Sequence, residues 1–525
     1  MADDITHYDF VEAYAGRSSY SNGDTVTLHV SCRAERYDIE IARWGSTRDV
    51  VWTATGREGI DQATPSDADA HGCGWTVSDT FVVPDDWRSG FYLVTLRAHG
   101  APSDRDTGYA CFVLRPSVRQ SAALLVVATN TYNAYNNWGG KSLYTGGRQV
   151  SFRRPFGRGL LCRPETDRDD RKSRPRRYRE QPDIDGAIYQ EYRYRLGYPG
   201  FMGSAGWFTY ERRLVEWAES AGFEFDYAVS ADLERQPNLC DGYSLVIGAG
   251  HDEYWSAGQR AAVEAHVRDG GNYLTMSGNT MFWQVRLEDD GDTMVCHKYT
   301  ANHTDPVATT DPGGTTGMWC DPYVGRPEAA FLGAGSAWGL YSRFGAATPH
   351  GSGGFTVYRH DHWLFAGTGL RYGDVLGADD GVVGYETVGC RINFDEYQLP
   401  VAAGGDATPT DIEVVAFTPS SNLAMGEYPA SIAALDDQGD LEFIAGRLFG
   451  RVDDDSLARI RHGNAVIVTC RPFGEDGGAV VTIGSTDWVF GLAADAAVGR
   501  VTRNALTRLG AETSAQEIGA NGNPT

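Results

Sequence analysis

The stretch Leu245-Val-Ile-Gly-Ala-Gly-His-Asp-Glu-Tyr-Trp-Ser256 predicts the fold of most of this 525-residue chain. Its first three residues are apolar without alternation, as in a strand that is buried on both faces of a parallel sheet. A Gly-Ala-Gly turn follows, and a segment from His251 to Trp255 then leads into a helix over 257–267. Ser256 is suited to cap that helix, and Asp269-Gly-Gly271 is suited to end it. A buried strand, a turn and a helix in this order indicate an α/β fold.

The same alternation of strands and helices extends to either side of this stretch. Apolar runs at 122–128 and 273–276 predict two more buried strands, and 210–221 predicts an amphipathic helix. Such an alternation indicates a parallel sheet of the flavodoxin-like or class I glutamine amidotransferase-like type. Ligands of these sheets bind beyond the carboxyl ends of the strands. In this chain those ends carry the segments 129–135, 250–255 and 277–279.

The chain before residue 116 has a different pattern, with short alternating strands and turn signals between them. Strands are expected at 24–30, 37–42, 91–96 and 109–114. This spacing predicts an immunoglobulin-like β-sandwich over 1–116, with a supporting or oligomerising role. The α/β catalytic domain is expected over 117–512 and a flexible tail over 513–525. Within the α/β domain we expect a long Arg-rich loop at 148–179, a β-rich insertion at about 290–480 and a helix at 498–509.

The composition of the chain disfavours several classes of binding partner. The formal net charge of −24 disfavours binding to nucleic acid or to a membrane surface, because phosphates repel an acidic protein. The chain has no run of about 18 apolar residues and no apolar stretch behind a basic N-terminus, so neither a transmembrane helix nor a secretory signal is expected. Nine cysteines, an odd number without a CxxC pair, fit reduced thiols. These features predict a cytoplasmic protein.

The segment from His251 to Glu253 is the first candidate site. No Cys or Ser occurs within 248–255, which disfavours a thiol or hydroxyl nucleophile at this turn. The segment offers an imidazole and two carboxylates, which are metal ligands or general acid–base groups. The alternative is a surface turn whose Asp252 and Glu253 cap the following helix. Asn279, at the end of the next strand, is placed to hydrogen-bond a substrate carbonyl or to form a turn.

A second candidate site is rich in tyrosine. Tyr132, Tyr135 and Tyr144 follow the buried strand at 122–128, among several asparagines and glycines that predict a loop. One interpretation is that these tyrosines pack as aromatics at the rim of a cleft. If a metal is present, their phenolate oxygens are hard donors, and with a carboxylate they suit ferric iron better than zinc.

Five short motifs occur along the chain in this order: Thr131-Tyr-Asn-Ala-Tyr-Asn136 with Trp138-Gly-Gly140, Gly250-His-Asp-Glu-Tyr-Trp-Ser256, Ser277-Gly-Asn279 with Phe282-Trp283, Gly384-Tyr-Glu386, and Gly484-Ser485 with Trp488. With these motifs the chain resembles the large (beta) subunit family of N,N-dimethylformamidase. The resemblance covers about 118–495 and, more weakly, the N-terminal sandwich. The chain is shorter than the family's large subunit, and we expect it to lack one accessory β-domain.

The resemblance implies a mononuclear iron site held by two tyrosine phenolates and one glutamate, beside a His–Glu pair and an asparagine. Glu253 would be the carboxylate ligand and His251 the general base. Glu386 would orient His251 and stabilise its charged form. Asn279 would hold the substrate or the oxyanion.

The phenolate ligands are implied in the same way. The first would come from Tyr132 or Tyr135, with Tyr132 preferred. Tyr144 is the expected second phenolate, with Tyr210 and Tyr178 as alternatives. The Arg-rich segment after Tyr144 is what leaves these alternatives open.

The function that the resemblance implies is hydrolysis of a C–N bond in a small amide, such as an N-substituted formamide, with Fe³⁺ as a Lewis acid. Two other functions stay open at this stage. One is a non-catalytic module of the same fold that binds a carbohydrate or a protein in a Tyr/Trp-rich cleft. The other is a zinc-dependent hydrolase that uses His251 and Glu253. We expect a homo-oligomer, with assembly around a small subunit as the alternative.

Overall fold

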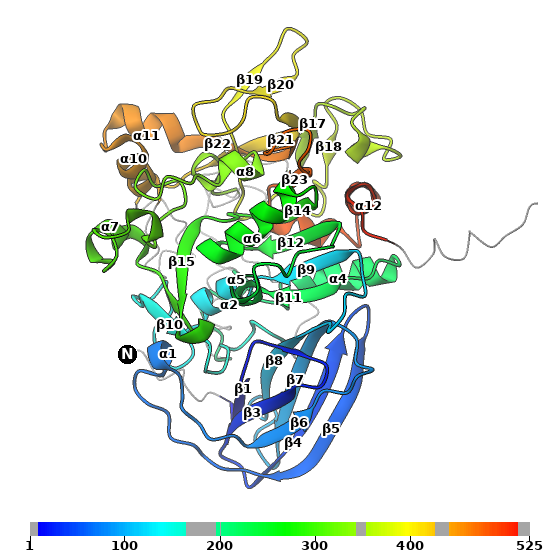
Figure 1. Cartoon of the computed structure of the whole chain (residues 1–525), viewed down its shortest axis with the longest axis vertical. Coiled ribbons are helices and arrows are strands. Elements are labelled where there is room, and N and C mark those ends of the chain that lie inside the picture. Colours follow the sequence, from blue (N-terminus) through cyan, green and yellow to red (C-terminus); the bar gives the residue numbers. More distant parts are fainter. Residues whose placement is uncertain (1–8, 164–195, 200, 343–352, 426–439, 513–525) are drawn as a thin grey trace, which may run out of the picture.

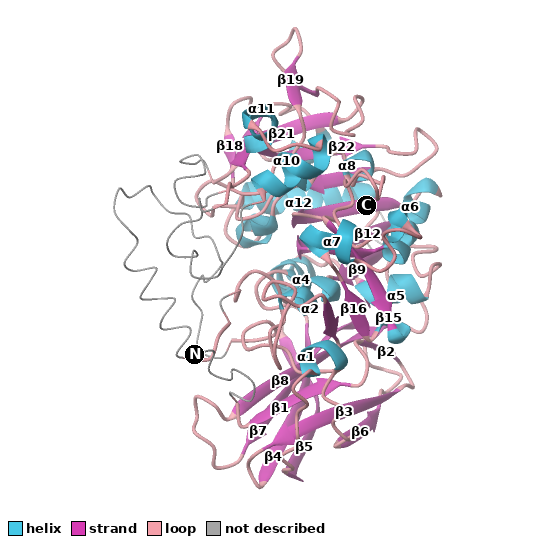
Figure 2. Ribbon diagram, turned by 90° about the vertical axis from the view of Figure 1, so that its left-hand side faces the viewer, coloured by secondary structure: helices cyan, strands magenta, loops and turns pink. Residues whose placement is uncertain are grey.

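The computed structural model describes residues 9–163, 196–199, 201–342, 353–425 and 440–512. They form a smaller all-β part, at the bottom of Figure 1, and a larger part in which helices surround a long sheet. Figure 2 shows the same arrangement from the side. The fold is therefore mixed α/β, with both parallel and antiparallel sheets.

The all-β part consists of two sheets whose facing side chains form one buried cluster. Val26 and Leu28 enter this cluster from one sheet, and Ile39, Val94 and Phe112 enter it from the other. All four predicted strands are present, while the name immunoglobulin-like stays a prediction. The sheet orders are β1 (Val11–Ala15), β3 (Thr25–Cys32), β6 (Asp79–Val82), and β2 (Ser19–Ser21), β8 (Thr107–Arg115), β7 (Gly90–Ala98), β4 (Arg36–Trp44), β5 (Arg48–Glu58).

The larger sheet is buried on both faces along its central strands. Leu125 and Ile247 belong to one hydrophobic cluster, whereas their neighbours Leu124 and Val246 belong to another. Successive side chains of a strand point to opposite faces, so these strands need apolar residues throughout. The strand order is β11 (Asp226–Val229), β9 (Ala123–Val127), β12 (Leu245–His251), β14 (Asn272–Gly278), β23 (Val480–Ile483), β22 (His462–Cys470), β21 (Glu413–Ser421), β17 (Phe355–Val357), β18 (Val375–Leu376).

The predicted parallel sheet is confirmed for the five strands from β11 to β23, and the remaining pairs are antiparallel. The finer name flavodoxin-like stays a prediction. Short strands form two further sheets: β10 (Gln149–Ser151), β16 (Thr293–Val295), β15 (Trp283–Glu288) and β13 (Tyr254–Ser256) in one, and β19 (Ile392–Phe394) with β20 (Pro400–Ala402) in the other.

The three predicted helices are confirmed, with ends shifted by at most two residues. Ser256 caps its helix as expected, because its hydroxyl accepts a hydrogen bond from the Gln259 amide at 3.1 Å. The helices are α1 (Ala68–His71), α2 (Thr129–Tyr135), α4 (Glu211–Ser220), α5 (Ser230–Arg235), α6 (Ala257–Arg268), α7 (Ala301–Thr304), α8 (Ala329–Leu332), α10 (Leu441–Phe449), α11 (Asp454–Arg461) and α12 (Ala496–Leu509).

Two local predictions are wrong. The Gly-Ala-Gly segment at 248–250 is part of β12 instead of a turn, because it pairs with β14 as far as His251 opposite Gly278. The first part of the tyrosine-rich segment, 129–135, forms helix α2 instead of a loop, whereas 136–144 contains neither helix nor strand. All seven residues of α2 are buried, so packing outweighs the modest helix propensity of its Thr and Asn residues. Within 290–480, helices α10 and α11 accompany strands β16 to β22, and the β-rich insertion stays a prediction.

Buried polar contacts join the all-β part to the helices of the larger part. The carboxylate of Asp232, on α5, accepts a hydrogen bond from Ser19 at 2.5 Å and lies 3.4 Å from the Nε of Arg115. Arg43 pairs with Glu219, on α4, at 2.6 Å. The two parts are therefore in direct contact, and the predicted domain boundary near residue 116 stays a prediction.

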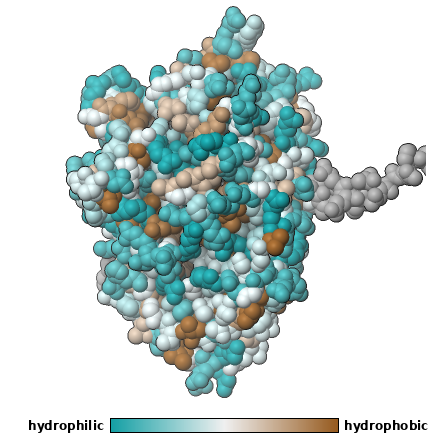
Figure 3. Space-filling model, viewed as in Figure 1, coloured by the Kyte–Doolittle hydropathy of each residue, from teal (hydrophilic) through white to brown (hydrophobic). Residues whose placement is uncertain are grey.

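The face shown in Figure 3 is mainly hydrophilic, with apolar residues in small scattered groups. No helix among the described residues combines the length and the hydropathy needed to cross a membrane. The expected Arg-rich loop contains β10 near its start, and its residues 164–179 lie outside the described residues, as does the expected tail at 513–525.

Candidate active site

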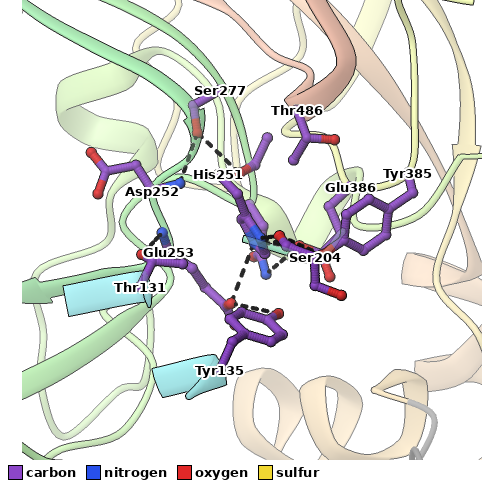
Figure 4. A network of polar contacts seen from close by, with 12 residues as sticks. Thr131, Tyr135, Ser204, His251, Asp252, Glu253, Ser277, Tyr385, Glu386 and Thr486 are labelled. Carbon is purple, nitrogen blue, oxygen red and sulfur yellow. Dashed lines mark hydrogen bonds and ion pairs between the residues drawn. The ribbon is translucent and has the colours of Figure 1, made fainter. Parts of the chain in front are cut away.

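The candidate site lies at the carboxyl ends of two neighbouring parallel strands. His251 is the last residue of β12, and Asn279 follows the last residue of β14. Glu253 follows His251 in the turn, and Glu386 reaches the same place from a segment that forms a bridge with Tyr341. Figure 4 shows the carboxylates of both glutamates pointing toward the imidazole of His251.

His251 is fixed on both sides of its ring. Its Nδ1 lies 2.6 Å from the carbonyl oxygen of Ser204, to which it donates a hydrogen bond. Its Nε2 faces both carboxylates, at 2.5 Å from Glu386 and 3.3 Å from Glu253. The hydroxyl of Tyr385 lies 3.2 Å from Nδ1. The bond to Ser204 therefore keeps a hydrogen on Nδ1, while Nε2 faces the two carboxylates.

Burial and charge act in opposite directions on the pKa of His251. Burial lowers it, because an imidazolium loses hydration in the interior. The carboxylates of Glu386 and Glu253 outweigh that effect and raise the pKa to about 10. In the chain alone, His251 is therefore a cation between two carboxylates at neutral pH.

Two phenol groups converge on Glu253. The hydroxyl of Tyr144 lies 2.7 and 2.8 Å from the two carboxylate oxygens, and that of Tyr135 lies 3.1 Å from one of them. The two rings stack with their centroids 4.2 Å apart. Burial and the charge of Glu253 raise the pKa of both phenols well above the usual range, so they donate to the carboxylate as neutral groups.

The structure places the other candidate tyrosines elsewhere. Tyr132 lies three residues before Tyr135 on α2, and its hydroxyl makes no hydrogen bond to Glu253. It lies beside the carboxyl group of Glu211, which together with burial raises the pKa of Tyr132. Tyr210 donates to the carbonyl oxygen of Gly203 at 3.2 Å. Tyr178 lies outside the described residues. At Glu253 the structure therefore brings Tyr135, and not the preferred Tyr132, together with Tyr144.

Asn279 completes the polar groups around His251. Its Nδ2 donates to Glu386 at 3.3 Å, and its Oδ1 is buried without a hydrogen-bond partner among the described residues. Its backbone φ of 49° lies in the left-handed region, which asparagine adopts more readily than most residues. A buried amide with an unused oxygen is suited to hydrogen-bond a ligand.

Asp252 does not take part in this cluster. Its side chain points away from His251 in Figure 4, and burial raises its pKa to about 8. Its backbone amide donates to Ser277 at 3.1 Å, which ties the turn to β14. Asp252 therefore has a structural role in this geometry.

Lys298 is a charged neighbour that sequence reasoning missed. Its Nζ lies 3.4 Å from the centroid of the Tyr144 ring, and the residue is 5% exposed. Burial raises the pKa of Glu253, but the hydrogen bond and charge of His251 and the charge of Lys298 outweigh this and lower it. The available sequence signal was that the chain has only three lysines.

The side chains fit a metal ion that prefers oxygen ligands. One potential ligand atom from each of His251, Glu253 and Glu386 lies within 4.8 Å of the others. The hydroxyls of Tyr135 and Tyr144 add two oxygens beside Glu253. Carboxylate and phenol oxygens are hard donors, and no thiolate belongs to this cluster.

The sequence of this chain is similar to that of one known family. The family described as N,N-dimethylformamidase beta subunit-like, C-terminal matches residues 37–502. The N,N-dimethylformamidase beta subunit of Alcaligenes sp is 26% identical over 237 residues, which cover 42% of this chain and 29% of that protein. The beta subunit from Paracoccus aminophilus is 25% identical over the same length, with the same coverage. The match thus spans less than a third of these relatives. Since the family match covers most of its length, the chain belongs to the N,N-dimethylformamidase beta subunit-like family.

Proposed function

We propose that this chain is a metal-dependent hydrolase that cleaves the C–N bond of a small amide, such as an N-substituted formamide. The observation that carries the proposal is His251, held between two carboxylates while two phenols converge on one of them. Such a cluster combines a proton carrier with a set of oxygen donors. Family membership supports the same reaction class, since two relatives are named N,N-dimethylformamidase.

We further propose that Glu253, Tyr135 and Tyr144 hold a single ferric ion. Their oxygens are hard, negatively charged donors when ionised, and Fe³⁺ suits such a set better than zinc, which is more often bound by nitrogen and sulfur. Bound there, the ion would act as a Lewis acid toward the amide carbonyl or the attacking water. Three anionic ligands would leave the site close to neutral.

His251 is the proposed general base. Its Nδ1–H is engaged by Ser204, which leaves Nε2 to take a proton from the attacking water. Once Glu253 is engaged as a ligand, Glu386 is the main carboxylate that stabilises the imidazolium, so the proton of His251 is more easily released. His251 can then pass the proton to the leaving amine, while Glu386 keeps the ring oriented.

Asn279 is proposed to stabilise the oxyanion. One hydrogen of its Nδ2 is used by Glu386, and the second is available to the negatively charged oxygen of the tetrahedral intermediate. A donor in this role contributes about 10²–10³ in rate. We propose that the chain works as a homo-oligomer, and a small protein that co-purifies with it would indicate the alternative assembly.

Metal analysis with visible spectroscopy tests this function. We expect about one iron per chain and a visible absorption band from phenolate-to-iron charge transfer, with hydrolysis of N-substituted formamides. A colourless, iron-free protein that is active would refute the ferric proposal. Activity that follows zinc content would favour the zinc-dependent hydrolase, and a folded protein without metal or activity would favour a binding module.

Gly278→Ala is expected to disturb the site through the backbone. A Cβ at Gly278 would lie 1.8 Å from the carbonyl oxygen of Glu386 and 2.7 Å from the amide nitrogen of Thr486. Relief of this contact must move the segment that carries Glu386, so we expect turnover to fall and the free energy of unfolding to drop by about 1–3 kcal/mol. The matched control is Gly313→Ala, where the nearest atom lies 3.8 Å away. Equal turnover and unfolding midpoints in the two variants would contradict this expectation.

A further inference from the structure

The two tyrosines at Glu253 are joined by the loop 136–143. Tyr135 ends helix α2, and Tyr144 follows the loop directly. The amide of Leu143 donates to the carbonyl oxygen of Ala134 at 3.1 Å, which closes the loop at its base. The position of the loop interior therefore affects both phenol groups.

Arg154 is buried against this loop, with an exposed fraction of 1%. Its guanidinium donates to the carbonyl oxygen of Asn136 at 3.0 Å and to that of Trp138, both within the loop. It also donates to the carbonyl oxygen of Ser151, at the end of β10, at 3.0 Å, and to the side chain of Asn133 at 3.4 Å. One planar group thus connects the last turn of α2, the loop and β10.

The burial of Arg154 contributes little to the free energy of unfolding, because the cation loses its hydration. Its four acceptors are three backbone carbonyl oxygens and the side-chain oxygen of Asn133. Burial lowers its pKa to about 10, so the group remains a cation at neutral pH. A buried charge loses much hydration, which the neutral acceptors and the nearby charge of Asp69 compensate only in part. What the arrangement does achieve is a fixed position for the carbonyls of the loop.

Residues of β1 and α1, from the N-terminal part of the chain, also hold the loop. Trp138 donates its indole N–H to Glu12, on β1, at 3.0 Å. The backbone amide of Lys141 donates to Asp69, on α1, at 2.7 Å. Gly140 lies so close to Asp69 that a Cβ there would be 2.8 Å from the carboxyl carbon. The loop therefore contacts Arg154 as well as β1 and α1.

We propose that Arg154 is a positioning residue that fixes Tyr135 and Tyr144 at Glu253 through the loop 136–143. Its planar fork bonds two loop carbonyls at once, which a lysine cannot reproduce. The consequence for metal binding rests on the proposed function, whereas the restraint on the loop is a property of the metal-free chain. Residues that orient metal ligands in this way typically contribute about 10–100-fold to metal affinity.

The test compares Arg154→Met and Arg154→Lys with the matched control Arg260→Met. Arg260 is also buried, at 3% exposed, and binds the carbonyl oxygens of Arg326 and Pro327 together with Glu264, far along the chain from the loop. Two measurements are made on each purified full-length protein. The first is the rate of cleavage after Lys141 by a lysine-specific protease without metal, and the second is titration with iron.

Cleavage after Lys141 reports directly on the loop. Lys141 is exposed, and the chain has only two other lysines, so fragment masses identify each cut. We expect cleavage to be about 10-fold faster in Arg154→Met, intermediate in Arg154→Lys and unchanged in Arg260→Met. We expect the affinity for iron to fall about 10–100-fold in Arg154→Met and to stay unchanged in Arg260→Met.

Two results would overturn the proposal. One is unchanged cleavage after Lys141 in both Arg154 variants. The other is faster cleavage with wild-type affinity for iron. If Arg154→Met does not fold, the same two measurements on Arg154→Lys test the proposal, because lysine keeps the charge but lacks the planar guanidinium. If the wild type binds no iron, the proposed function fails, and faster cleavage after Lys141 in the variants would still support the restraint by Arg154.

Discussion

Glu253→Gln is expected to remove iron from the protein and to abolish turnover. Glutamine keeps the size of the side chain but removes the charge to which the hydroxyls of Tyr135 and Tyr144 now converge at 2.7–3.1 Å. Because Glu253 is proposed as a direct ligand, its loss should weaken iron binding by more than the roughly 10–100-fold effect of residues that only orient ligands. Elemental analysis and the visible absorption band measure the result.

Asp252→Asn is the matched control for this variant. Asp252 is the adjacent carboxyl, equally buried, but directed away from the cluster. Since burial raises its pKa to about 8, it is mostly protonated at neutral pH, and asparagine is close to it in charge and shape. We expect Asp252→Asn to keep its iron. If it loses iron while Glu253→Gln retains it, the assignment of the ligand is wrong.

His251→Ala is expected to keep its iron and to lose turnover. The imidazole is the proposed proton carrier, and removal of such a group lowers rates by about 10²–10⁴. The metal stays because Glu253, Tyr135 and Tyr144 are unchanged. The measurement is kcat/KM for an N-substituted formamide beside the iron content of the same sample.

His266→Ala controls for the loss of a buried imidazole. His266 is 7% exposed, and its Nε2 lies 3.1 Å from the carbonyl oxygen of Asn272, which begins β14 at the end opposite to Asn279. We expect near wild-type turnover in this variant at a temperature where it is folded. Wild-type kcat/KM in His251→Ala would rule out His251 as the base.

Much of the central fold could be predicted from the sequence because its signals are local. The unbroken apolar runs at 122–128 and 245–247 correspond to β9 and β12, whose neighbours lie on both faces of the sheet. The Ser256 cap and the helix after it also follow from adjacent residues. Strand ends at one edge of a parallel sheet bring distant side chains together, which is why His251 and Asn279 could be expected to be neighbours.

The other features of the fold and of the site depend on contacts between residues that are distant in the sequence. Helix α2 forms where the sequence predicted a loop, and the hydroxyl that it brings to Glu253 is that of Tyr135 and not that of Tyr132. Lys298 lies 45 positions after Glu253 without any motif, and its approach to Tyr144 comes from chain folding alone. Glu386 was expected from resemblance to a family, since nothing in its own surroundings indicates a partner for His251.

The pairing of β14 with β23 has a consequence for how this protein forms during synthesis. Tyr273 pairs with Val480, so the parallel half of the sheet gains its last strand only after some two hundred further residues have left the ribosome. Until then β14 is an open edge, which is able to pair with other chains and so favours aggregation. Contacts of such long sequence separation also slow folding. We therefore expect nascent chains that stop before residue 480 to depend strongly on chaperones.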